Sequence, residues 1–336
     1  MNMILPRPYL SRRALLAAGA AALAVPPASA QDAVPPDWAR AWPETDFGRA
    51  LVPFDEILSG GVPRDGIPAL TDPAMIAAAD DDRLEDVEPV MTVEIEGASP
   101  RAYPLRYLTW HEIANDTVGG IPIAVTFCPL CNSGLVFDRR MGGRVLEFGV
   151  SGMLRHSDLI MYDRETFTWW QQFDGRAIVG ALAGERLDPV VTWMEGWGTY
   201  RERNPDGLVM AEPTDHRRAY GQNPYVGYDT SPRPFLYRGE DPPHGIPPLA
   251  RVVRIGDRAW PLDRLAAEGE IVEGGVRLFW AEGMTSALDG RAIAASRDVG
   301  QVRVTDPTTG ADVVHEVVFA FAFHAFEPDG RWMLGR

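Results

Sequence analysis

The chemistry of this chain converges on Cys128 and Cys131, the only two cysteines in 336 residues. An apolar, β-branched run over 121–127 precedes them, and a second apolar segment over 135–137 follows them. Because turn-forming residues lie between these segments, the pattern predicts two strands joined by a tight turn that brings the sulfurs together. This spacing suits a reversible dithiol, a pair of thiolates that hold one metal ion, or a short structural disulfide.

The spacing of the two cysteines and the residues after them favour some of these three chemistries over others. A disulfide across a two-residue gap closes a small ring and adds little stability, which disfavours a structural bond. A thioredoxin-like enzyme needs its first cysteine at a helix N-terminus, whereas a strand is expected after Cys131. Metal binding is therefore the leading hypothesis. A periplasmic thiol-disulfide oxidoreductase with Cys128 and Cys131 as its catalytic pair is second, and a non-catalytic binding or scaffold protein with an inert disulfide is third.

A metal ion would need ligands beyond the two thiolates. His111, in the stretch Trp110-His111-Glu112, comes one element before the cysteine strand and is the expected third ligand. Met161 and His156 follow one to two strands later and are weaker choices for a fourth. Thiolates with imidazole and thioether form a soft set, which favours copper ahead of zinc.

Other cofactors and catalytic classes find no support in the sequence. The chain contains no lysine, which excludes a Schiff base to pyridoxal phosphate and a P-loop. It also has no dinucleotide fingerprint and no nucleophile elbow. Charged residues flank several apolar segments and are expected to tie sheet corners together by bidentate hydrogen bonds; they are Asp138, Arg139, Asp158, Asp163 and Arg164.

Short apolar segments at regular spacing predict a mainly β fold built from antiparallel strands with few short helices, with α+β as the alternative. Asp72-Pro73 resembles a helix start and predicts a helix over 74–79. Further along, Arg258-Ala259-Trp260-Pro261-Leu262 echoes Arg101-Ala102-Tyr103-Pro104-Leu105, and a Gly-Gly turn follows each. This similarity predicts two related β modules from an internal duplication.

The predicted organisation has five parts. They are a signal peptide over 1–30, an N-terminal arm with short helices over 31–89, a first β module with the cysteine pair over 90–200, a connection rich in Pro, Gly and Tyr over 201–248, and a second, degenerate β module over 249–336.

The N-terminus predicts export to the periplasm. Arg12-Arg13 precedes an Ala/Leu-rich stretch, as in twin-arginine signals, and Ala28-Ser29-Ala30 is a small-residue cleavage site. Cleavage is expected between Ala30 and Gln31. The apolar stretch is too short to span a bilayer, so no membrane span is expected in the mature form.

The mature charge limits the partners. The signal region holds three of the 32 basic residues and none of the 47 acidic ones, so the mature chain carries 29 minus 47, or −18. Such an acidic surface disfavours nucleic acid. The partner expected from the leading hypotheses is a periplasmic redox or metal-donor protein.

Several long blocks resemble a family of exported prokaryotic proteins catalogued only as a domain of unknown function. The blocks include Thr126-Phe127-Cys128-Pro129-Leu130-Cys131-Asn132-Ser133, Met161-Tyr162-Asp163-Arg164, Trp110-His111-Glu112-Ile113 and Asn223-Pro224-Tyr225-Val226-Gly227-Tyr228. The resemblance covers nearly the whole chain from about residue 50. It implies that His111, Cys128 and Cys131 belong to the family pattern, whereas His156 stands where asparagine is expected. It brings no activity of its own.

Overall fold

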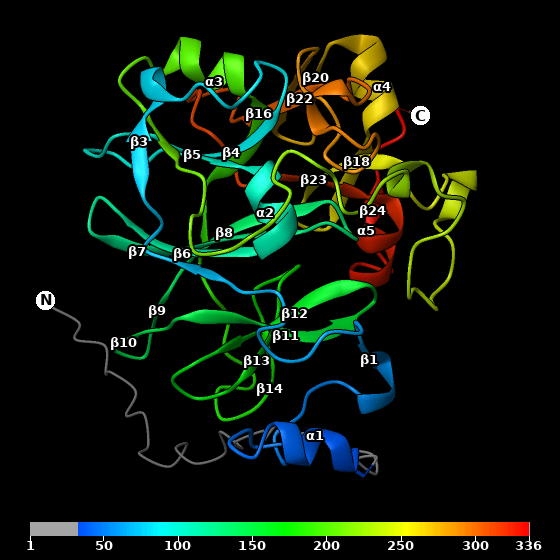
Figure 1. Ribbon diagram of the computed structural model, residues 1–336. Helices are drawn as coiled ribbons and strands as arrows, with labels where there is room; N and C mark the ends of the chain where they lie inside the picture. The colour runs from blue at the N-terminus through cyan, green and yellow to red at the C-terminus, as the bar shows by residue number, and fades with distance from the viewer. Residues whose placement is uncertain (1–32, 336) are drawn as a thin grey trace, which may run out of the picture. The chain divides into compact units, whose positions relative to one another are not determined.

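The computed structural model describes residues 33–335, and the predicted signal peptide with its cleavage site lies outside them. The described chain is mainly β, as predicted, with 24 strands and five short α-helices (Figure 1). Within residues 33–335 no helix has the length and apolarity needed to cross a membrane.

One five-stranded sheet carries the cysteine turn. Its strand order is β15-β8-β7-β6-β2, with bounds Pro189–Val190, Ser133–Asp138, Ile121–Cys128, Ile113–Val118 and Leu70–Thr71. Gly119 and Gly120, both at positive φ, close the hairpin between β6 and β7 and set the register Val118 to Ile121. Strand β7 is buried along nearly its whole length, which explains its continuous apolar sequence.

A second five-stranded sheet packs against the first and carries the next hairpin. Its order is β1-β11-β12-β13-β14, with bounds Ile57–Ser59, Phe148–Arg155, Asp158–Asp163, Trp169–Gln171 and Ala177–Val179. The α1 helix (Pro36–Ala41) lies in the N-terminal segment, whose Trp38, Trp42 and Phe47 pack around Trp169. The small hairpin of β9 (Arg140–Met141) and β10 (Arg144–Val145) extends from this region.

The remaining strands form a repeated pattern. The first sheet has the order β16-β4-β5-β17-β3 with bounds Thr192–Gly196, Pro89–Val93, Arg101–Pro104, Leu208–Met210 and Met75–Ala77. The second has the order β23-β18-β19-β24 with bounds Glu316–Phe319, Arg251–Ile255, Arg258–Pro261 and Arg331–Trp332. In both sheets the two central strands are antiparallel, and a late strand joins the second of them in parallel.

The helices and hairpins repeat in the same order. The α2 helix (Leu105–His111) follows β5 and leads into the β6–β7 hairpin, while α4 (Leu262–Glu268) follows β19 and leads into β20 (Glu270–Glu273) and β21 (Val276–Ala281). The α3 helix (Trp197–Arg203) and α5 (Ala320–Phe326) occupy matching places before β17 and β24. Strand β22 (Gln301–Thr305) completes the sheet of β20 and β21. The sequence similarity therefore has a counterpart in element order and strand pairing.

The helix predicted over 74–79 is wrong. Residues Met75–Ala77 form β3, and only Ala78–Asp80 make a 3-10 turn. Strand β3 pairs with β17 over three residues, so backbone hydrogen bonds to a distant strand override the local helix signal. Asp72 does not cap a helix and has a φ of 47°.

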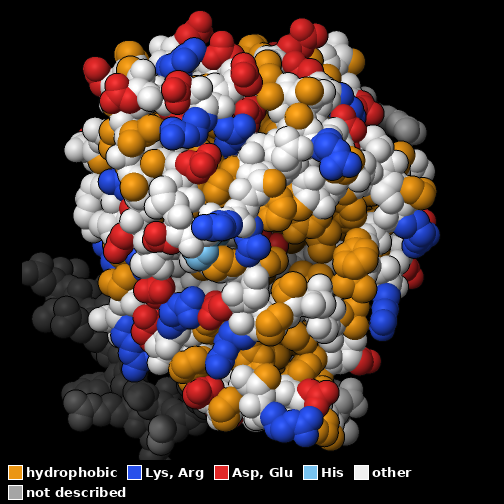
Figure 2. All heavy atoms as spheres, in the orientation of Figure 1, with side chains coloured by type: hydrophobic (Ala, Val, Ile, Leu, Met, Phe, Trp, Pro, Cys, Tyr) orange, Lys and Arg blue, Asp and Glu red, His pale blue; other side chains and the backbone are white. Residues whose placement is uncertain are grey.

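One large hydrophobic core joins the two modules. It contains both cysteines, residues of the first module such as Val125 and Met161, and residues of the second such as Val252 and Phe319. The described residues 33–335 group as one compact unit. On the face drawn in Figure 2, charged side chains of both signs surround an area right of centre where apolar side chains gather.

Candidate metal centre

The Cys-Pro-Leu-Cys turn joins β7 to β8 and is fixed by hydrogen bonds to distant segments. Cys128 is the last residue of β7 and pairs with Ser133, so residues 129–132 form the loop. The Leu130 carbonyl accepts from the Tyr228 hydroxyl at 2.9 Å, and the Cys131 carbonyl accepts from the Phe319 N–H at 2.9 Å. The two sulfurs are therefore held in place by parts of the chain that lie far away in sequence.

Asn132 and Ser133 attach the end of the same turn to β23. Asn132, at a φ of 52°, donates its side-chain amide to the Val317 carbonyl at 2.7 Å. The Ser133 hydroxyl donates to the Glu316 carboxylate at 2.7 Å. Glu316 in turn forms an ion pair with Arg254, so its charge is compensated there.

Asp158 reaches the two cysteines from the neighbouring sheet. It is the first residue of β12, directly after the two-residue turn formed by His156 and Ser157. Its Oδ1 accepts from the Gln171 side chain at 2.8 Å and from the Phe173 N–H at 3.0 Å. Its Oδ2 is buried and has no hydrogen-bond partner among the described residues.

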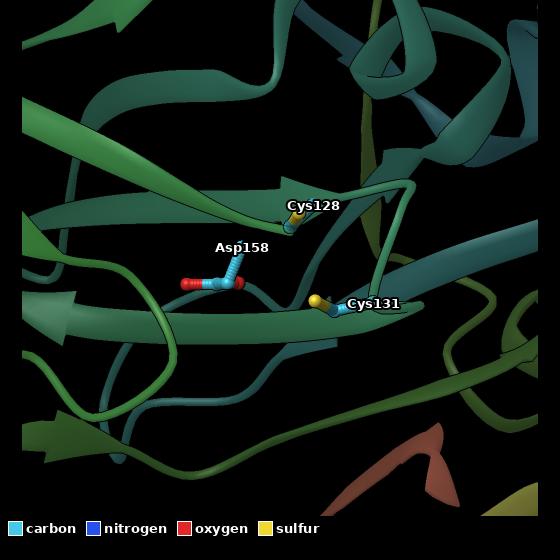
Figure 3. Close-up of side chains that lie close together, drawn as sticks. All are labelled: Cys128, Cys131 and Asp158. Atoms are coloured by element: carbon cyan, nitrogen blue, oxygen red, sulfur yellow. The ribbon is translucent and has the colours of Figure 1, made fainter. Parts of the chain in front are cut away.

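The three side chains form a compact buried group (Figure 3). One ligand atom each from Cys128, Cys131 and Asp158 lies within 4.8 Å of the others, and all three residues are buried. Both cysteines are free thiols, and Cys128 Sγ lies 3.8 Å from the Ser157 carbonyl. Separations of this size allow one ion to contact all three atoms after small rotations.

Glu112 is a fourth acidic group beside this centre. It follows α2 directly, and its carbonyl accepts from the Phe127 N–H at 2.8 Å, one residue before Cys128. Its side chain is buried and, with Tyr225, lines a pocket beside the centre. Among residues 33–335, no arginine or histidine forms an ion pair with Glu112 or Asp158.

The backbone of Glu112 is left-handed, and the matching position in the second module is a glycine. Its φ of 59° and ψ of −29° suit glycine, because a β-carbon is crowded there. The matching position after α4 is Gly269, with a φ of 74° and a ψ of −39°, and its carbonyl accepts from the Trp280 N–H as that of Glu112 does from Phe127. A carboxyl side chain therefore occupies a place where the second module has glycine.

Burial shifts the pKa of all four acids upward. Burial, reinforced by the charge of Asp158, raises the pKa of Glu112 to about 8. Burial likewise raises the pKa of Asp158 to about 7, although hydrogen bonds from Gln171 and Phe173 oppose it. Burial also raises the pKa of Cys128, and it raises that of Cys131 well above its usual range. Without a cation Glu112 and the two thiols favour their protonated forms at neutral pH, and Asp158 is about half protonated.

His111 lies next to Glu112 in sequence, but the structure does not bring its ring into the group of three. Its Nδ1 lies 2.7 Å from the Pro68 carbonyl, which can only accept, so Nδ1 carries the proton. Its Nε2 then accepts from the Tyr220 hydroxyl at 2.7 Å. Burial lowers the pKa of His111 to about 4, which keeps the ring neutral. Both ring nitrogens are thus engaged.

His156 and Met161 occupy two other places on the β11–β12 hairpin. His156 and Ser157, at φ of 51° and 66°, are the two central residues of the turn. The His156 ring packs edge-on against Phe326, and burial lowers its pKa to about 4. Met161 is fully buried in the same core cluster as the cysteines and lies opposite Val150 and Trp170.

Two residues of the centre differ from the sequence interpretation. Asp158 is predicted to tie a sheet corner, but it forms no ion pair among the described residues and faces the thiols. At positions 111 and 112 the sequence interpretation favours His111, whereas the structure places Glu112 beside the centre. A register count from the Gly119-Gly120 hairpin identifies Glu112, because pairing Val118 with Ile121 places residue 112 opposite 127.

An apolar pocket of about 580 Å³ opens beside the centre. Glu112 and Leu130 lie in its wall, together with Leu159 of β12. The segment 224–235 covers it from the other side and contributes Tyr225, Tyr228 and Phe235, among others.

Comparison with known proteins identifies a family for which no activity is described. A family model described as "Protein of unknown function (DUF3179)" matches residues 64–330. No curated protein and no solved structure matches the chain. Since the family model covers most of the sequence, this chain belongs to the DUF3179 family.

Proposed function

We propose that this protein binds a thiophilic metal ion through Cys128, Cys131 and Asp158. The observation that carries the proposal is the convergence of two thiols and a carboxylate, with ligand atoms within 4.8 Å of one another, in a buried setting. The free Oδ2 of Asp158 supports it, because a buried carboxylate oxygen without a partner is costly.

The charge balance of the centre supports the same proposal. The pKa values of four buried acids are raised when no cation is near, so burial opposes their ionisation. A metal ion would displace protons from the ligating groups and compensate the charges that remain. Arg254 pairs with Glu316 and Glu327, and among the described residues no arginine or histidine forms an ion pair with Glu112 or Asp158.

The donor set bears on the identity of the ion. Two thiolates with a carboxylate are common ligands of zinc, which accepts sulfur and oxygen donors in a tetrahedral site. The expectation of copper rests on thiolates with imidazole and thioether, and the hydrogen bonds of His111 make imidazole ligation less favourable. Zinc is therefore the ion we favour, with copper second. Three protein ligands would leave a fourth position open toward a solvent or substrate group.

The pKa directions argue against the oxidoreductase hypothesis. An attacking thiol needs a lowered pKa, whereas burial raises the pKa of both Cys128 and Cys131. An inert disulfide would also leave the free oxygen of Asp158 without a role.

Elemental analysis of the protein purified without chelator tests the proposal. We expect about one equivalent of zinc or copper per chain, lost in Cys128→Ser and in Asp158→Asn. His156→Asn is the matched control, because it changes the same hairpin two residues from Asp158 and should retain the ion. His111→Gln should retain it as well, and loss of the ion there would restore His111 as a ligand.

A protein without metal would contradict the proposal. A chain that contains no metal as purified, that takes up neither zinc nor copper on reconstitution, and whose thiols cycle readily with a disulfide would move the protein to the redox class.

A further inference from the structure

The pocket beside the metal centre has the size and lining of a small-molecule site. Its volume of about 580 Å³ lies in the range of ligand pockets in proteins. Its apolar wall comes from three parts of the chain, namely the segment 60–67, the β11–β12 hairpin and the segment 224–235. Val226 and Phe235, at its covering segment, are 53% and 56% exposed although both are large and apolar.

Gly152 allows the floor of this pocket to form. It has a φ of 79°, and a β-carbon there would lie 2.1 Å from the Val62 carbonyl oxygen. The Gly60 N–H donates to the Gly152 carbonyl at 2.8 Å, which attaches the segment 60–67 to β11. The segment 60–67 and β11, two of the parts that line the pocket, are thus held together by a backbone hydrogen bond and close packing.

The lining of the pocket contains one acidic group and no basic one. Glu112 is the one ionisable acid or base in its lining apart from the tyrosines, and the lining contains no arginine or histidine. Tyr225, Tyr228 and Phe235 add three aromatic rings, whose faces attract cations. The mature chain carries a net charge near −18, which draws cations toward the protein and repels anions.

We infer that this pocket binds a hydrophobic amine, whose ammonium group faces Glu112 and whose apolar body lies among the apolar side chains. Glu112, whose pKa burial raises to about 8, is mostly protonated at pH 7 while the pocket is empty; an ammonium group would favour its ionised form and pair with it. The amine would also explain why a carboxyl side chain is present where the matching position of the second module has Gly269. The inference goes beyond metal binding, because Glu112 is not one of the three proposed ligands.

Calorimetric titration with three probes of equal chain length tests the inference. The probes are octylammonium, 1-octanol and octanoate, added at pH 7 to the full protein as purified. We expect octylammonium to bind about tenfold more tightly than 1-octanol, which corresponds to about 1.4 kcal/mol, and octanoate to bind most weakly. In Glu112→Gln the preference for octylammonium over 1-octanol should disappear, because the amide keeps the shape without the charge.

A matched pair of bulky substitutions tests the position. Val226→Trp should weaken octylammonium binding about tenfold by filling the mouth of the pocket. Val145→Trp, on β10, changes a residue that is 50% exposed and lies outside the pocket, and should leave binding unchanged.

Three results would overturn the inference: no binding of octylammonium, equal binding of 1-octanol, or the same preference in Glu112→Gln. The Cys128→Ser variant separates this inference from the metal proposal, because it should lose the ion and still prefer octylammonium. Loss of that preference together with the ion would show that the metal, and not Glu112, selects the ligand, and would also overturn the inference.

Discussion

Replacing Glu112 by glutamine should change how the stability of the metal-free protein depends on pH. In the folded chain the pKa of Glu112 is raised from 4.5 to about 8 by burial. Below pH 4.5 the carboxyl is protonated in both the folded and the unfolded chain, so it carries no electrostatic penalty. As pH rises toward 8 the unfolded chain releases the proton and the folded chain keeps it, so the free energy of unfolding falls.

The size of the effect follows from the two pKa values. Each unit of pKa difference is worth about 1.4 kcal/mol, so the full loss from well below pH 4.5 to well above pH 8 is about 5 kcal/mol. Between pH 5.5 and 8 the loss is about 3 kcal/mol. Glu112→Gln removes this term and leaves the other titrating groups in place, so the free energy of unfolding of the variant should fall by about 3 kcal/mol less over that range.

Urea unfolding of chelator-treated protein at pH 5.5 and pH 8 measures the difference. Glu96→Gln is the control, because Glu96 is exposed and its variant should follow the wild-type curve. Parallel curves for wild type and Glu112→Gln would contradict this expectation, since the buried carboxyl would then have the same pKa in the folded and the unfolded chain.

Two further substitutions test local features of the fold. His156→Asn should leave the free energy of unfolding within about 0.5 kcal/mol of wild type, because the preference of asparagine for this turn is offset by the lost contact of the ring with Phe326; a loss of about 2 kcal/mol in urea would contradict this. Gly152→Ala should lower it by about 3 kcal/mol, because the new β-carbon would clash with the Val62 carbonyl. Gly143→Ala, at the same φ of 79° but with open space around it, should cost only about 1 kcal/mol, and equal losses in the two variants would show that strain and not the clash dominates.

The fold was predictable where strong local signals coincide with the final structure. The glycine pairs after positions 118 and 273 set two-residue hairpins, and the apolar runs beside them became β7 and β21. The similarity between residues 101–105 and 258–262 was visible because both encode a strand followed directly by a helix. The helix over 74–79 failed because the pairing of β3 with β17 involves residues more than a hundred positions away, which no local pattern contains.

The centre was predictable in part. The cysteine pair stands out in the sequence because a turn that brings two sulfurs together favours metal or redox chemistry over a purely structural role. The sequence does not identify Asp158 as part of the centre, because a carboxylate at a strand end normally pairs with arginine, and Arg155 and Arg164 lie close to it in sequence. In the structure both arginines bind other acids. Arg155 pairs with Glu56, and Arg164 pairs with Asp65 and Glu147.

The turn that contains His156 explains why the family resemblance predicts asparagine at this position. The resemblance predicts asparagine at this position, and the structure places it in a two-residue turn that needs positive φ at both central residues. Asparagine is among the residues that adopt such angles most readily. The expectation of asparagine thus follows from backbone geometry and requires no role in chemistry.

The attachment of the cysteine turn to β23 also fixes the order in which the centre can assemble. Asn132 donates to the carbonyl of Val317, a residue 185 positions later in the chain. While the polypeptide is being synthesised, the turn therefore has no partner for this amide until almost the entire chain has left the ribosome. Contacts of such large sequence separation form slowly, because the intervening segment must first be ordered. The two sulfurs should consequently reach their final positions among the last steps of folding, and a nascent chain that ends before residue 316 should be unable to hold an ion.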